Sequence, residues 1–139
     1  MDKERRLEFS KYFSETAKEC LDDAKFNFDF GRFKVSVNRA YYAVFNAMRA
    51  VAAIEGFDSK KHSGLISHFN FTYLRTKTFN PETSKLIFSA FEARGDADYE
   101  AFHVVSADDA KIQIDNAEHI ISMIEPYLKS CWAEMEAKQ

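Results

Sequence analysis

The sequence predicts an all-α fold, an antiparallel helical bundle of about five helices. Among its 139 residues, 46% are apolar or aromatic and fourteen are Phe, enough for a core without disulfides or a metal. Only four Gly and two Pro occur, so loops must be few and elements long. Apolar residues recur at steps of three and four, the spacing of one helix face. We expect a single domain over residues 1–139, with a core at about 7–128 and a tail at 130–139.

Two long helices are expected first, at residues 3–29 and 33–55. The first carries one apolar stripe that can face a core. The second is apolar over so much of its girth that we expect it to be the central helix, packed on several sides. Gly31 and Gly56 follow these helices, and glycine is the typical residue just beyond a helix C-terminus.

Two shorter helices are expected in the middle of the chain. One covers residues 60–74, with Ser59 as its N-cap. The other covers residues 80–94 and opens with an Asn-Pro pair, because proline suits the first position of a helix. Gly95 is expected to end this helix and to release the chain into a loop.

The fifth helix is expected to begin at Ser106. Asp108 and Asp109 then lie in its first turn, where the helix dipole favours carboxylates. Pro126 should kink the helix, because a proline in a helix interior removes one backbone donor and clashes with the preceding turn. Residues 130–139 either continue the helix or fray.

The balance of charge excludes a protein whose whole surface attracts nucleic acid. With 19 basic and 22 acidic residues the formal net charge is −3, so RNA contact needs a local cluster or a surface completed by a second subunit. Cys20 and Cys131 lack the spacing of a metal or redox motif and are expected to be reduced core residues. We find neither a secretory signal nor an apolar run of membrane-spanning length, so we expect a cytoplasmic protein without membrane contact.

The densest group of chemically active side chains follows the fourth helix. Arg94 shares a helix face with an apolar stripe, so its charge must be paired or must face a cleft. Carboxylates, a phenol and an imidazole come directly after it, from Asp96, Asp98, Tyr99 and His103. Two interpretations stay open. Either Arg94 pairs with Asp98 and only pins the loop, or its planar guanidinium meets a phosphate.

Other basic residues are weaker candidates. Lys60, Lys61 and His62 lie in the first turn of the third helix, where they are either an anion-binding patch or ordinary surface cations. Arg39 and Arg49 stand among aromatic residues and are expected to pair with acidic neighbours. No calcium-loop or zinc spacing and no Gly-rich phosphate loop is found, so we expect no metal and no cofactor.

Three motifs of this chain resemble those of HEPN-domain proteins. They are VNRAYYAVF at residues 37–45, KHSGLISHF at 61–69, and Arg94 followed by Ala97-Asp98-Tyr99. The resemblance spans most of the chain and implies a helical bundle that pairs as a homodimer. It also implies a metal-independent ribonuclease of the kind that acts as a toxin beside a small nucleotidyltransferase antitoxin, with Arg94 steadying phosphate charge.

The family's usual histidine is not at its usual place. In the family's signature, four to six residues separate the arginine from the histidine. The corresponding positions of this chain hold Tyr99, Glu100 and Ala101, and His103 lies too far along. The chain is similar instead to a branch that reads Arg…Ala-Asp-Tyr. A phenol keeps its proton at neutral pH, so Asp98 or His103 is expected to act as the base, with Lys61 and His62 completing the site.

Two functions follow from this resemblance. In the first, the chain is the toxin half of a nucleotidyltransferase-linked module that cleaves RNA, and the partner enzyme silences it by attaching AMP to Tyr99. In the second, the chain is a non-catalytic module that binds a nucleotide or the partner nucleotidyltransferase. The displaced histidine favours the second function.

Overall fold

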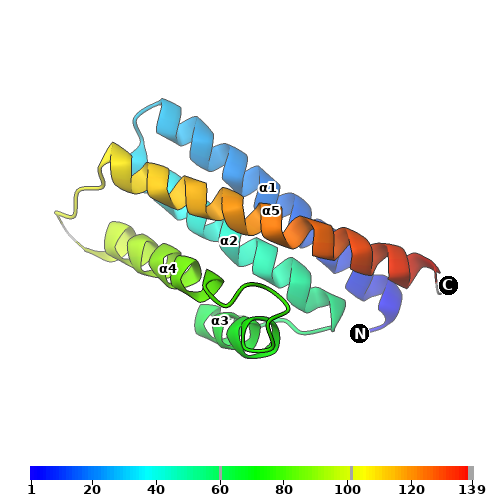
Figure 1. Cartoon of the computed structure of the whole chain (residues 1–139). Helices are drawn as coiled ribbons and strands as arrows, with labels where there is room; N and C mark the ends of the chain where they lie inside the picture. The colour runs from blue at the N-terminus through cyan, green and yellow to red at the C-terminus, as the bar shows by residue number, and fades with distance from the viewer. Residues whose placement is uncertain (60, 101, 138–139) are drawn as a thin grey trace.

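The computed structural model describes residues 1–59, 61–100 and 102–137. Its helices, in chain order, are α1 (Lys3–Asp29), α2 (Phe33–Ile54), α3 (His62–Phe69), the π-helical turn η1 (Asn70–Leu74), α4 (Thr83–Tyr99) and α5 (Ala107–Ala137). The predicted all-α bundle is confirmed. In Figure 1, α1, α2 and α5 run side by side along the length of the molecule, and α3 and α4 lie on one side of them.

The helix α2 is the central one, as predicted. It contacts α1, α3, α4 and α5, and most of its side chains are buried. Two buried hydroxyls join it to α1, because Ser10 donates to the carbonyl of Ala50 and Ser36 donates to that of Ala24, each at 2.7 Å. Gly31 and Gly56, which follow α1 and α2, both have a positive φ (74° at Gly31), as expected of glycines that end a helix.

The third helix differs from its prediction at both ends. Ser59 is not the N-cap. Its hydroxyl accepts from the backbone nitrogen of Lys61 at 3.2 Å in a turn that precedes the helix. Lys60 lies outside the described residues. Beyond α3 the chain widens into η1, where the nitrogen of Arg75 bonds the carbonyl of Asn70 at 2.8 Å, and this π turn accompanies the burial of two adjacent side chains, Tyr73 and Leu74.

The helix α4 begins later and ends later than predicted. Residues 80–82 form a tight turn, in which the side-chain oxygen of Asn80 accepts from the nitrogen of Glu82 at 3.0 Å, so the helix starts at Thr83. It does not stop at Gly95. The helix continues for one more turn because Ala97 is buried against α2 and the start of α5.

This extra turn moves the candidate residues. Asp96, Asp98 and Tyr99 lie on the last turn of α4 and not in a loop. Gly95 faces open space on the outer side of the helix, since a Cβ added there would meet no atom within 4 Å. The side chains around Arg94 are therefore held by helical geometry, on a rigid element.

The helix α5 is capped at its start and docked at its end. Ser106 precedes it, and its hydroxyl accepts from the nitrogen of Asp109 at 3.0 Å. The helix runs through Pro126 to Ala137, so the predicted tail continues as helix. The indole of Trp132 donates to the hydroxyl of Ser10 at 2.8 Å, which holds this end on α1.

Within the described part of the chain, no helix combines the length and the apolar character that crossing a bilayer requires. Both cysteines are free, and the two differ in burial: Cys20 belongs to the core, and Cys131 is partly exposed. Burial is the main reason why the pKa of each thiol is raised.

Candidate functional site

Arg94 lies at the centre of an aromatic and polar cluster. Its side chain is only 11% exposed, and its guanidinium carbon sits 4.9 Å from the centre of the Tyr41 ring and 5.5 Å from that of Tyr99. One terminal nitrogen donates to the hydroxyl of Tyr99 at 3.3 Å and lies 3.7 Å from a carboxylate oxygen of Asp98. The charge is thus covered by rings from α2 and α4.

The ion pair with Asp98 leaves the guanidinium incompletely satisfied. A good Arg–carboxylate pair has two parallel contacts of about 2.7–2.9 Å, whereas here one contact of 3.7 Å joins the two groups. The Nε atom of Arg94 is buried and has no hydrogen-bond partner among the described residues. Buried donors are nearly always paired, so this arginine retains capacity for another acceptor.

Asp98 is also held from α2. The amide nitrogen of Asn38 donates to its carboxylate at 3.1 Å, and the amide oxygen of Asn38 accepts twice from Arg39, at 3.1 and 3.0 Å. The predicted pairing of Arg39 with an acidic residue is therefore wrong, because its guanidinium donates to the side-chain amide of Asn38 and forms no ion pair with a described residue. Sequence reasoning did not single out Asn38, although it stands three residues before Tyr41 and so shares a helix face with it.

A hydrogen bond links this cluster to α3. The hydroxyl of Tyr41 lies 2.9 Å from Nδ1 of His62. Burial raises the pKa of Tyr41 to about 12, so the hydroxyl keeps its proton. Because Nδ1 of His62 is the hydroxyl's one hydrogen-bond partner among the described residues, we assign the hydroxyl as the donor and Nδ1 as the acceptor. Burial, and then the charges of Arg94 and Arg49, lower the pKa of His62. The imidazole is neutral at neutral pH and carries its proton on Nε2.

The other predicted site residues are more dispersed. Tyr99 is 76% exposed, so its ring reaches solvent while its hydroxyl meets Arg94. His103 does not join Arg94. It lies 4.0 Å from the carboxylate of Glu100 and lines, with Asp96, a separate hollow of about 360 Å³ between α4 and α5. This placement follows from the extra turn of α4, which leads the chain past Arg94 before the loop begins.

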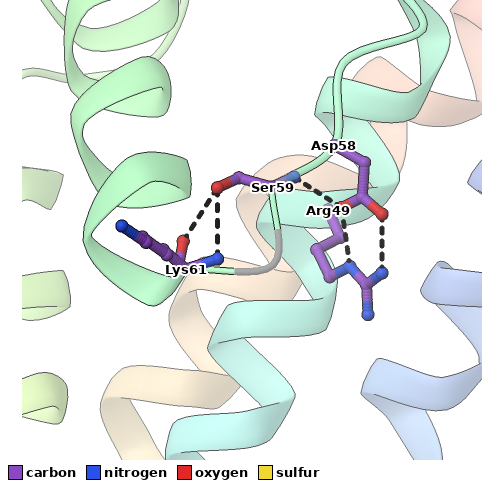
Figure 2. Close-up of polar contacts among 4 residues, drawn as sticks. All are labelled: Arg49, Asp58, Ser59 and Lys61. Atoms are coloured by element: carbon purple, nitrogen blue, oxygen red, sulfur yellow. Dashed lines mark hydrogen bonds and ion pairs between the residues drawn. The ribbon is translucent and has the colours of Figure 1, made fainter.

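Arg49 forms the acidic pair that the sequence predicts. Its Nε and one terminal nitrogen donate to the two carboxylate oxygens of Asp58 at 3.1 and 2.8 Å, as Figure 2 shows. In the same view, Ser59 joins the backbone of Lys61, whose side chain points away from the Arg49–Asp58 pair. Lys61 is exposed and does not contact Arg94 in the structure. No group of described residues has the composition to hold a metal ion.

Comparison with known proteins identifies the family. The family model for the HEPN domain matches residues 10–127. The chain belongs to the HEPN-domain family. The resemblance drawn from the three motifs is therefore confirmed, and all three lie within this HEPN match.

Several relatives cover most of the HEPN domain. A UPF0332 protein of Thermotoga maritima is 34% identical over 92% of this chain and 95% of its own length. Two proteins of Methanocaldococcus jannaschii bear the name "Putative toxin". One is 29% identical over 83% of this chain and 85% of its own length, and the other is 24% identical over 84% and 79%.

Proposed function

We propose that this HEPN protein is the toxin half of a module whose other half is a small nucleotidyltransferase, and that it acts on RNA without a metal. The observation that carries the proposal is the nearly buried, incompletely paired guanidinium of Arg94, which Tyr41 links to the neutral imidazole of His62. Two relatives that bear the name of toxins support the toxin context.

The chemistry would divide among these groups. Arg94 would bind a phosphate oxygen and stabilise the charge that develops on it. Asp98 would accept the proton of the ribose 2′-hydroxyl, since Nδ1 of His62 is already occupied by the hydroxyl of Tyr41. The Nε2–H of His62 would donate a further hydrogen bond, and exposed Lys61 would attract the strand.

Cleavage of tRNA by the purified protein in EDTA tests the proposal. We expect Arg94→Ala to lower the cleavage rate by about 100-fold or more, the usual effect of removing one group that stabilises a developing charge. Arg75→Ala is the matched control, because this exposed arginine lies over Phe71, outside the cluster. Equal rates for wild type and Arg94→Ala would reject the assigned role of Arg94.

Tyr99 is the proposed site at which the partner acts. Its exposed phenol would attack the α-phosphate of ATP on the nucleotidyltransferase and release pyrophosphate. We expect intact-protein mass spectrometry to show one added adenylyl group after incubation with the cognate enzyme and ATP, and none on Tyr99→Phe. An unchanged mass of the wild type would contradict this step.

A homodimer is proposed as the working form. An acidic chain of 16.1 kDa offers few phosphate contacts by itself, and α4 exposes the rings of Phe88, Phe91 and Tyr99. Sedimentation velocity at micromolar concentration should show a dimer. A single monomeric species would contradict it.

A second function, a non-catalytic module that binds a nucleotide or the partner enzyme, is favoured by one observation. His103, the imidazole nearest in sequence to the family's catalytic position, lines a different hollow. Binding of RNA that Arg94→Ala abolishes, without cleavage by either protein, would select this function.

A further inference from the structure

A second hollow lies beside the Arg94 cluster, between α2 and the start of α3. Its volume is about 350 Å³, within the range of small-ligand sites. Its lining consists of two aromatic rings and four polar side chains, those of Tyr42, Phe45, Asn46, Arg49, Ser59 and His62. Apart from His62, the roles proposed above use none of these residues.

The polar groups of this hollow present a fixed acceptor and a fixed donor. Asn46 is only 7% exposed, and its amide nitrogen donates to the carbonyl of Tyr42 at 2.8 Å, which leaves the amide oxygen as an acceptor. His62 accepts from Tyr41 on Nδ1, which leaves Nε2–H as a donor. The edge of a nucleobase carries both kinds of group and needs such partners.

The charge of the hollow fits a neutral ring better than a phosphate. Among the described residues that line it, Arg49 is the one with a permanent positive charge, and Asp58 neutralises it through two hydrogen bonds (Figure 2). Tyr42 is half-buried, and its ring offers an apolar surface on which bases stack whatever their sequence. The ring of Phe45 is only 5% exposed and packs against His62, with 4.3 Å between the ring centres, so Tyr42 provides the stacking surface. Phosphate charge would be better placed at Arg94, whose pair with Asp98 is loose.

The two places are adjacent. The ring of Tyr41 faces the guanidinium of Arg94, with 4.9 Å between the Cζ atom and the ring centre, and its hydroxyl meets His62. One aromatic side chain thus separates the phosphate position from the wall of the hollow.

We propose that the hollow between α2 and α3 binds a nucleobase, from an RNA strand or from a free nucleotide, while the attached phosphate lies at Arg94. The placement of the phosphate rests on the proposed function. The base site itself does not, because it is built from Tyr42, Phe45, Asn46 and His62.

Calorimetric titration with the four nucleoside 5′-monophosphates, and with ribose 5-phosphate as the probe without a base, tests this. We expect at least one mononucleotide to bind and ribose 5-phosphate to bind at least tenfold more weakly. Tyr42→Leu should weaken the mononucleotide about fivefold or more, as expected when stacking on one base is lost. Tyr12→Leu, an exposed tyrosine on α1, should bind as the wild type does. Equal affinity for ribose 5-phosphate, or an unaffected Tyr42→Leu, would overturn the inference.

A measurement on the wild type guards against a Tyr42→Leu chain that does not fold. The ring protons of His62, assigned through their loss in His62→Gln, should shift on addition of a nucleoside, which has no phosphate. Ring protons that do not move with any of the four nucleosides would overturn the base site.

Arg94→Ala separates this inference from the proposed function. If RNA is not cleaved, or Arg94→Ala cleaves normally, but nucleosides still shift His62, the base site stands and the proposed function fails. If Arg94→Ala loses cleavage while Tyr42→Leu binds and cleaves as the wild type does, the proposed function stands and the base site fails. Tighter binding of hexanucleotides than of mononucleotides would identify an RNA strand as the source of the base.

Discussion

Tyr41 joins the two halves of the cluster, because its ring covers Arg94 and its hydroxyl holds His62. The pair of Arg94 and Asp98 could be foreseen from their spacing of four residues on a helix. The place of Tyr41 could not, since its aromatic stripe on α2 also fits an ordinary core residue. That it meets a histidine twenty-one residues later depends on how α3 packs, which spacing along one helix does not determine.

The histidine makes stability depend on pH. The pKa of His62 is lower in the folded protein than its ordinary value of about 6.5. The unfolded chain therefore takes up the proton first, and the free energy of unfolding should fall as pH drops from above about 6.5 through the lowered folded value. Urea unfolding at pH 7.5 and at pH 5 should show a smaller difference for His62→Gln than for the wild type. His119→Gln, at an exposed position on α5, is the control and should keep the full difference.

At the scale of elements, the sequence predicts α1, α2 and the start of α5 well, because long apolar stripes agree with the glycine stops after α1 and α2 and with Ser106 before α5. The end of α4 shows why such signals fail. Gly95 is a typical stop, yet the burial of Ala97 two residues later outweighs it. The π turn η1 has no sequence pattern of its own and depends on tertiary packing.

Gly95→Ala tests the continuation of α4, and Gly31→Ala is the comparison at a glycine that does end a helix. Gly95→Ala should raise the free energy of unfolding by about 0.5–1 kcal/mol, because alanine costs less backbone entropy in a helix and a Cβ there meets nothing within 4 Å. Gly31→Ala should instead lower it, since φ is 74° at that position. Chemical denaturation measures both changes. Destabilisation by Gly95→Ala would mean that residue 95 does not stay helical.

At the scale of the whole molecule, one hydroxyl joins three helices. Ser10 on α1 is fully buried, donates to the carbonyl of Ala50 on α2, and accepts from the indole of Trp132 on α5. The position of this serine in a stripe of larger apolar residues gave no sign of that role, because both partners are more than thirty residues away in sequence.

Removal of that hydroxyl should weaken the whole bundle. Ser10→Ala removes both hydrogen bonds of this buried hydroxyl and leaves the part-buried indole N–H of Trp132 without its partner, and we expect a loss of about 1–3 kcal/mol in the free energy of unfolding. Ser122→Ala, at an exposed position on α5, should change it by less than about 0.5 kcal/mol. A melting temperature of Ser10→Ala equal to that of the wild type would contradict the role of this serine.

The buried serines between α1 and α2 also bear on how the protein moves. Because the hydroxyls of Ser10 and Ser36 hold these two helices together at both ends, their amide protons should exchange with deuterium only when the entire chain unfolds. The side-chain hydrogen bonds that join α3 and α4 to α2 and α5, such as those of Tyr41 with His62 and of Gln113 with Ser89, are only partly buried, so this outer layer can open locally at a smaller free-energy cost. The covered guanidinium of Arg94 would then become accessible through a local fluctuation of that layer, while α1 and α2 stay in place.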